Sequence, residues 1–320
     1  MVQKRVALPA VGLGLLAAGG LAGRAIVRSW RNNPDPLGGQ PVRFPDGEQR
    51  TVQLPDGADI TTVSVGDGPT IVLVHGLTAS KHDWGPIAPT LVAAGYRVLA
   101  VDQRGHGEST PGNAGYGSTQ LAADLAHVLD ELDVHAAALV GHSMGGMTAM
   151  AYAVHHPAAF NARVERLVLI ATAASLETAR HQLGLSLGGV HIPEGIVPAD
   201  DRLRVGAGLG VFGRSPSLHM VDEVIDMFRA CPEPVRAAAT VALKDHDVVD
   251  QLPSIAAPTL VIGADRDQLI RPHQVRELAD GIPDAALELF PDAGHMVHWE
   301  ERDAVSQLIL NHLAREVPGT

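Results

Sequence analysis

Residues 136–146 read AAALVGHSMGG, and this stretch decides the fold. Its first five residues are small and apolar, as a strand buried on both faces of a sheet requires. The pattern Gly141-His142-Ser143-Met144-Gly145 follows, and residues 144–155 then have the composition of a helix. A Gly-x-Ser-x-Gly pattern between a strand and a helix predicts a sharp turn that holds the serine hydroxyl out from the end of the sheet. Ser143 is therefore the candidate nucleophile.

The same turn predicts where a developing negative charge would be stabilised. The first backbone N–H groups of a helix have no partner inside the helix, and they carry the positive end of its dipole. The N–H of Met144 is one expected donor of an oxyanion hole. The second donor is expected from the loop after the apolar run Thr70–Val74, which reads His75-Gly76-Leu77-Thr78. We predict the Leu77 N–H in this role, with Thr78 as the alternative.

A serine hydroxyl needs a base to take its proton, and the base needs a carboxylate to orient it. His295 follows a strand-like run at 286–290, and Asp265 and Asp267 follow the run Thr259–Ile262. Both loops would lie at the carboxyl ends of their strands. Asp267 lies deeper in its loop and is the predicted carboxylate, whereas Asp265, nearer the strand end, is the alternative. The chain order serine, aspartate, histidine is the order found in α/β-type hydrolytic sites.

Strand-like and helix-like segments alternate from about residue 49. Besides the runs already named, strands are predicted at 52–54, 60–65, 98–101 and 167–170, and helices at 119–132, 272–280 and 302–315. This alternation predicts an α/β fold with a mostly parallel sheet and helices on both faces. It breaks between residues 173 and 250, where helices are predicted near 219–230 and 234–250. We therefore expect a core of residues 49–172 and 251–320, with a helical cap (173–250) over the substrate site.

The N-terminal segment differs from the rest of the chain. Residues 1–31 contain five Lys or Arg and no acidic residue, and residues 6–23 are uncharged. Eighteen residues as a helix reach about 27 Å, close to the thickness of a bilayer core. The segment is predicted to be a membrane anchor, a secretory signal or a helix of the globular domain, so the protein is expected to be membrane-associated or exported. Residues 32–48 are rich in Pro, Gly and Asn and are predicted to form a linker.

Composition excludes several classes of function. The 320 residues are 46% hydrophobic and carry a net charge of −12, which argues against a nucleic-acid partner. Cys231 is the single cysteine, so neither an intrachain disulfide nor a cysteine-based zinc site is expected. The sequence contains no His-Glu-x-x-His motif. No metal and no cofactor are predicted, and the expected partner is a small-molecule substrate. The oligomeric state is not indicated.

These motifs, taken in order, carry a family resemblance. His75-Gly76, the segment Asp102–Ser109 (DQRGHGES), GHSMGG at 141–146, GADRD at 263–267 and AGH at 293–295 resemble the α/β-hydrolase superfamily. The resemblance spans about residues 50–315. It implies an eight-stranded, mostly parallel sheet flanked by helices, with a helical cap inserted after strand six. It also implies a structural, not a catalytic, role for Asp102–Ser109.

The nucleophile narrows the expected chemistry. Related haloalkane dehalogenases and epoxide hydrolases use an aspartate at the elbow, so Ser143 excludes those reactions. The resemblance implies a serine hydrolase, esterase-like or lipase-like, that cleaves a carboxylic ester with an apolar acyl group through an acyl-enzyme. Hydrolysis of thioesters or activated C–C bonds, or ligand binding without catalysis, are the alternatives. Candidate substrate-contacting residues are His75, His142 and Trp84.

Overall fold

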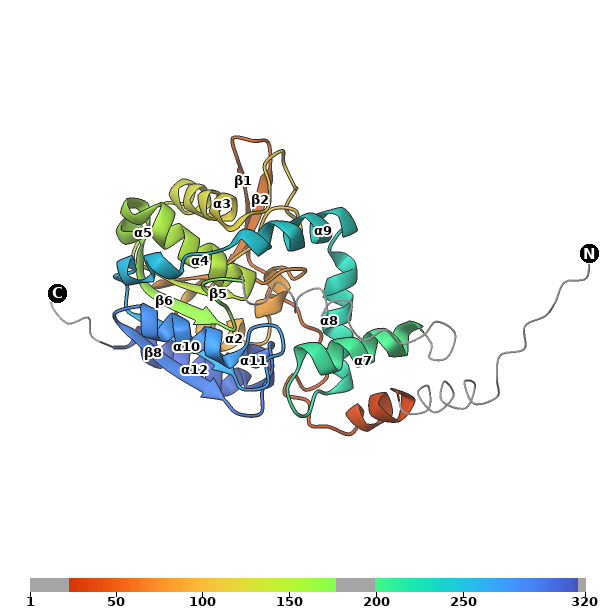
Figure 1. Ribbon diagram of the computed structural model, residues 1–320. Helices are drawn as coiled ribbons and strands as arrows, with labels where there is room; N and C mark the ends of the chain where they lie inside the picture. The colour runs from red at the N-terminus through yellow and green to blue at the C-terminus, as the bar shows by residue number, and fades with distance from the viewer. Residues whose placement is uncertain (1–22, 177–198, 316–320) are drawn as a thin grey trace, which may run out of the picture.

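The computed structural model of the chain describes residues 23–176 and 199–315 (Figure 1). Its centre is an eight-stranded sheet in the order β1-β2-β4-β3-β5-β6-β7-β8. The pairs β1–β2 and β2–β4 are antiparallel, and the other neighbours are parallel. The predicted eight-stranded, mostly parallel sheet is confirmed. In chain order, the strands are β1 Glu48–Gln53, β2 Asp59–Val65, β3 Thr70–Val74, β4 Arg97–Val101, β5 Ala137–His142, β6 Val164–Ile170, β7 Thr259–Ala264 and β8 Ala285–Phe290.

Helices cover both faces of the sheet, because successive residues of its central strands point to opposite sides. In β3, Val72 and Val74 belong to one apolar cluster, whereas Ile71 and Leu73 belong to the other. The first face packs against α3 Ser118–Glu131, α4 Met144–His155, α5 Pro157–Arg163, η3 Val249–Ser254 and α10 Pro272–Gly281. The second packs against η1 Lys81–Trp84, α2 Ala88–Ala93, α11 Val297–Glu300 and α12 Arg302–Leu313.

The region after β6 is helical, as predicted for a cap. It contains α7 Ala199–Val211, α8 Leu218–Ala230, α9 Glu233–Ala242 and the short helix η2 Leu243–Asp245. In Figure 1, α7 and α8 lie to one side of the sheet and its helices. A backbone bridge between Ser175 and Asp247 joins the two ends of this region. Residues 177–198 of the predicted cap lie outside the described residues.

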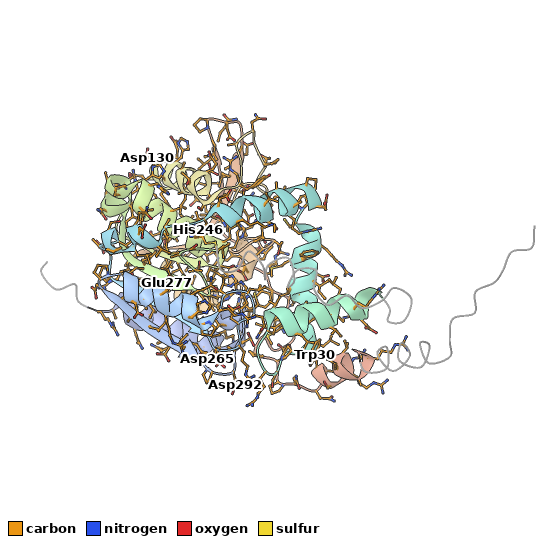
Figure 2. The ribbon with its side chains drawn as sticks, in the orientation of Figure 1. Trp30, Asp130, His246, Asp265, Glu277 and Asp292 are labelled. Atoms are coloured by element: carbon orange, nitrogen blue, oxygen red, sulfur yellow. The ribbon has the colours of Figure 1, made fainter. Side chains whose placement is uncertain are left out.

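The segment before β1 packs against the cap, which differs from the linker predicted for residues 32–48. The helix 23–30 buries Val27 and Trp30 in a cluster that also contains residues of α7 and α8. Trp30, labelled in Figure 2, lies against α7 at Gly208. Further along, the carboxylate of Asp35 accepts a hydrogen bond from Ser217 (3.1 Å) and lies 2.9 Å from His219 Nδ1. Residues 32–48 therefore form an ordered segment across the cap, and we call this segment the strap.

Most of the predicted N-terminal apolar segment, residues 6–22, lies outside the described residues. Within residues 23–176 and 199–315, no helix is both long enough and apolar enough to span a membrane.

Candidate active site

Ser143 occupies the turn between β5 and α4, with φ 52° and ψ −117°. A residue other than glycine rarely adopts a positive φ, and doing so costs about 1–3 kcal/mol. Hydrogen bonds on both sides hold this conformation. The Ser143 N–H donates to the carbonyl of Ile170 (2.9 Å), and its own carbonyl accepts from Gly146 N–H (2.9 Å) and from Thr172 Oγ1 (2.7 Å). The turn thus has the geometry that the Gly-x-Ser-x-Gly pattern predicts.

Gly145, two residues after Ser143, allows the elbow to approach the neighbouring strand. A Cβ atom on Gly145 would lie 2.0 Å from the carbonyl oxygen of Val74, at the end of β3. No side chain fits at that distance, so glycine is required for close contact between α4 and β3. This contact places the start of α4 beside the loop that follows β3.

The predicted base and carboxylate are in direct contact. His295 Nδ1 donates to Asp267 Oδ2 at 2.8 Å, although the two residues lie on different loops, after β8 and β7. Asp267 is 1% exposed, and its other oxygen accepts the N–H groups of Leu269 (2.8 Å) and Ile270 (2.9 Å). With its proton on Nδ1, a neutral His295 has Nε2 free to accept a proton.

The alternative carboxylate lies elsewhere. Asp265 is 44% exposed at its side chain and pairs with Arg276 at 3.5 Å. Of the two aspartates that the sequence left open, Asp267 is the one that contacts His295.

The elbow and the histidine loop meet through His142, which precedes Ser143. His142 Nε2 donates to the backbone carbonyl of His295 at 3.0 Å, and the two imidazole centroids are 4.9 Å apart. The hydroxyl of Ser143 itself makes no hydrogen bond within the part of the chain that the structure describes. The fold therefore brings the loops of Ser143 and His295 together without joining their side chains by a hydrogen bond. Such contacts often tighten only when substrate binds.

A buried polar cluster beneath this contact was not predicted from the sequence. Asp83 Oδ1 accepts from His298 Nε2 (2.9 Å), and Asp83 Oδ2 lies 3.2 Å from His142 Nδ1. Burial alone would raise the pKa of Asp83, but the adjacent His298 and His142 hold it well below its usual range. Burial and His298 also lower the pKa of His142 to about 4. Imidazole and carboxylate are metal-binding groups, and here Asp83 accepts a hydrogen bond from His298 and lies against His142.

The loop after β3 is fixed by a second buried network. His75 Nδ1 donates to the carbonyl of Gly76 (2.7 Å), and its Nε2 accepts from Gln103 N–H (3.0 Å). The Gln103 amide donates to the His75 carbonyl (2.7 Å) and accepts from Thr148 on α4 (2.8 Å). Burial lowers the pKa of His75, in agreement with a neutral ring. Gln103, which the sequence did not single out, thus links the loop to the helix after the nucleophile.

The predicted oxyanion donors lie at this junction. A Cβ atom on Gly76 would lie 3.3 Å from the Cβ of Ser143, so the loop abuts the elbow. In residues 23–176 and 199–315, the N–H groups of Leu77 and Met144 find no hydrogen-bond acceptor. Both are therefore available to a ligand, and the alternative, Thr78, has a φ of 66°.

The structure places the candidate substrate-contacting residues His75, His142 and Trp84 in the interior of the protein. Each is buried, with a side chain bonded to or packed among framework residues. The ring of Trp84 meets the ring of His142 edge-on and that of His298 at a tilt, inside the core. These contacts hold the loops of the site together.

Known proteins resemble this chain over most of its length. A family model described as α/β hydrolase fold matches residues 69–190 and 232–302. A Variovorax paradoxus protein, RutD, provisionally named as a carbamate hydrolase, is 33% identical over 263 residues, which cover 79% of this chain and 95% of the relative. A 2-hydroxy-6-oxononadienedioate/2-hydroxy-6-oxononatrienedioate hydrolase of Cupriavidus pinatubonensis is 29% identical over 282 residues (83% and 96%).

A solved structure agrees with the sequence relatives. The enol-lactonase of Burkholderia xenovorans has a TM-score of 0.68 and 27% identity, and the match covers 83% of this chain and all of that one. The match to the family model, the identity to curated relatives and the eight-stranded sheet agree with one another. The chain therefore belongs to the α/β-hydrolase family and is a hydrolase of that fold.

Proposed function

We propose that the protein is a serine hydrolase that cleaves a carboxylic ester through an acyl-enzyme intermediate, with Ser143, His295 and Asp267 as its catalytic triad. The observation that carries the proposal is the strained elbow of Ser143 beside a loop whose imidazole is already oriented by a buried carboxylate. Strain of this kind is retained where function requires it.

The roles of the residues follow from their positions. His295 Nε2 takes the Ser143 proton as the hydroxyl oxygen attacks the ester carbonyl carbon. The N–H groups of Leu77 and Met144 stabilise the oxyanion, and the N-terminus of α4 adds its dipole. The protonated His295 then donates to the leaving alcohol, while Asp267 stabilises the imidazolium. Water activated by His295 releases the acid and restores the serine.

The ester class rests on weaker support than the nucleophile. An enol-lactonase among the structural relatives favours a substrate with an ester bond, because a lactone is a cyclic ester. The two curated relatives carry names for other hydrolytic reactions. Hydrolysis of thioesters or activated C–C bonds is therefore the second candidate, since the same three residues would serve it.

A panel of p-nitrophenyl esters of increasing acyl length tests the proposal. We expect the wild-type protein to turn over at least one ester and Ser143→Ala to lower kcat by about 10⁴-fold or more. A folded Ser143→Ala variant that keeps wild-type turnover would exclude this mechanism. Absence of turnover of any ester by the wild type, with turnover of thioesters or C–C substrates, would favour the second candidate. No turnover of any of these would favour a binding protein.

We also propose that the N-terminal segment attaches the protein to a membrane. Residues 6–23 are uncharged, and the helix 23–30 that follows exposes Arg24 and Arg28 while it buries Val27 and Trp30. Cationic side chains next to an apolar segment are attracted to anionic headgroups. The packing of this helix on α7 would hold the cap close to the lipid, in agreement with a lipid-like ester as substrate.

A further inference from the structure

The end of helix α7 in the cap runs along the loop that carries His295. The His295 N–H donates to the carbonyl of Val211 (2.7 Å), and the Arg214 N–H donates to the carbonyl of Asp292 (2.8 Å). The two segments are therefore paired by their backbones, and the base is bonded to the cap through its own amide. Neither bond involves a catalytic side chain.

A single carboxylate bridges the same two segments. Glu300, the last residue of α11, accepts Gly294 N–H at Oε1 and Gly213 N–H at Oε2, both at 2.8 Å. Gly294 immediately precedes His295, and Gly213 lies two residues after the end of α7. A Cβ atom on Gly213 would lie 2.0 Å from the carbonyl oxygen of Asp292, so these backbones are in contact.

We propose that Glu300 is a positioning residue that couples the cap to the catalytic base, so that His295 is in its working position only while the cap is docked. The importance of His295 rests on the proposed function, whereas the coupling itself rests on the four backbone and carboxylate contacts. The bridge joins two segments whose hydrogen-bonded residues lie 78 and 84 positions apart in the sequence, and Glu300 lies outside both segments. Its loss would remove two of the four contacts that hold these segments together.

The ionisation of Glu300 makes the coupling sensitive to pH. Burial raises the pKa of Glu300 to about 7, against the effect of the two N–H groups that it accepts. Below that pH the carboxyl group gains a proton, and its protonated oxygen is a poor acceptor for a backbone N–H. The bridge is therefore complete above pH 7 and weakens as the pH falls. The nearby acidic groups Asp267 and Glu301 raise its pKa further.

Hydrogen exchange measured on the full-length protein tests the coupling without reference to activity. The test variant is Glu300→Gln, whose amide nitrogen would face one of the two N–H groups. Glu301→Gln is the matched control, because the side chain of Glu301 makes no hydrogen bond with the described residues. At pH 8 we expect exchange at residues 211–214 and 292–296 to rise by about tenfold or more in Glu300→Gln and to stay unchanged in Glu301→Gln. Equal exchange in wild type and Glu300→Gln would overturn the proposal.

Kinetics then test the effect on the base. At pH 8 we expect Glu300→Gln to lower kcat/KM for a p-nitrophenyl ester by about tenfold, because a small displacement of a base is enough for such a loss. We also expect kcat/KM of the wild type to fall more steeply below pH 7 than that of Glu300→Gln, which lacks the titrating carboxyl group at residue 300. If the pH profiles of kcat/KM are parallel for the wild type and Glu300→Gln, then Glu300 does not act on the base. This result would also overturn the proposal.

Two further results separate the test of the coupling from the test of the proposed function. Glu300→Asp keeps the charge but is one methylene shorter, so it should lose one of the two contacts. It serves as the test variant if Glu300→Gln does not fold, and we expect the same rise in exchange at residues 211–214 and 292–296. If Glu300→Asp folds with wild-type exchange, the coupling is refuted. If the wild type hydrolyses no ester, the proposed function fails, while the exchange data still decide whether Glu300 holds the cap to the loop.

Discussion

The side chain of Asp267 has a defined orientation because both of its oxygens are engaged, one with two backbone N–H groups and the other with His295. Asp265, two residues earlier, is exposed and pairs with Arg276. A carboxylate can fix the tautomer of an imidazole only when its own position is fixed. Burial therefore distinguishes Asp267, which contacts His295, from Asp265, which does not.

Replacing each aspartate by asparagine separates their roles. We expect Asp267→Asn to lower kcat by about 10³–10⁴-fold, because an amide no longer stabilises the imidazolium or fixes its tautomer. Asp265→Asn should change kcat by less than about twofold, since surface ion pairs contribute little. Steady-state kinetics on the best ester of the panel measures both. Equal losses in the two variants, or a fully active Asp267→Asn, would contradict the assignment.

Chain order and local pattern predicted Ser143, His295 and Asp267, because each follows a recognisable strand, buried for Ser143 and Asp267 and partly exposed for His295. The same reasoning could not find Asp83, which lies 59 residues from His142 and 215 from His298. Gln103 and Glu300 could not be predicted for the same reason. The tertiary fold brings their hydrogen-bond partners near, and these partners include backbone groups. His142 and Trp84 were given a binding role because polarity and position do not reveal burial.

The contact between β3 and α4 sets the position of Ser143 relative to the loop after β3. It depends on Gly145, whose Cα approaches the β3 backbone too closely for any side chain. The backbones of α4 and β3 are in direct contact here, so neither element can relieve a clash by changing a side-chain rotamer. The stability of this junction is thus sensitive to a single methyl group.

Gly145→Ala should therefore destabilise the fold by about 3 kcal/mol or more, since an added methyl group would overlap the Val74 carbonyl. Gly115→Ala makes the same substitution where nothing lies within 4 Å, and should change stability by less than about 0.5 kcal/mol. Urea unfolding midpoints of the two variants provide the comparison. Similar midpoints would mean that the junction tolerates a shift of the α4 backbone.

At the level of elements, apolar β-branched runs predicted the central strands well, because both faces of those strands are buried. Helix α7 was missed: Gly206, Gly208 and Gly210 weaken its intrinsic helix propensity by about 1 kcal/mol each. Its packing against Trp30 supplies tertiary stabilisation that no local pattern reveals. The strap at 32–48 was predicted as a linker because its contacts with α8 are equally remote in sequence.

Over the whole molecule, charge is divided between a basic N-terminal segment and an acidic remainder. Arg24, Arg28 and Arg31 are exposed, and the helix that carries two of them is packed on the cap. If the segment meets a membrane, the cap meets it too. The orientation of the site relative to the lipid is then set by packing, not by a flexible tether.

Vesicle binding by the full-length chain tests this arrangement. We expect binding to phosphatidylglycerol-containing vesicles to exceed binding to phosphatidylcholine vesicles and to weaken with salt. Changing Arg24, Arg28 and Arg31 to Glu should reduce binding to the anionic vesicles by about tenfold or more. A matched triple variant at Arg50, Arg266 and Arg276, which are exposed elsewhere, should bind like the wild type. Equal binding by both triple variants, or no binding by the wild type, would refute the membrane proposal.

The most direct test of the central claim is covalent labelling by a fluorophosphonate, followed by mass spectrometry of the digested protein. Such probes react with a serine only when a neighbouring base activates its hydroxyl. The account predicts one adduct, on the peptide that contains Ser143, with labelling abolished in Ser143→Ala and strongly slowed in Asp267→Asn. A folded wild-type protein that stays unlabelled, or that is labelled at a different serine, would contradict it.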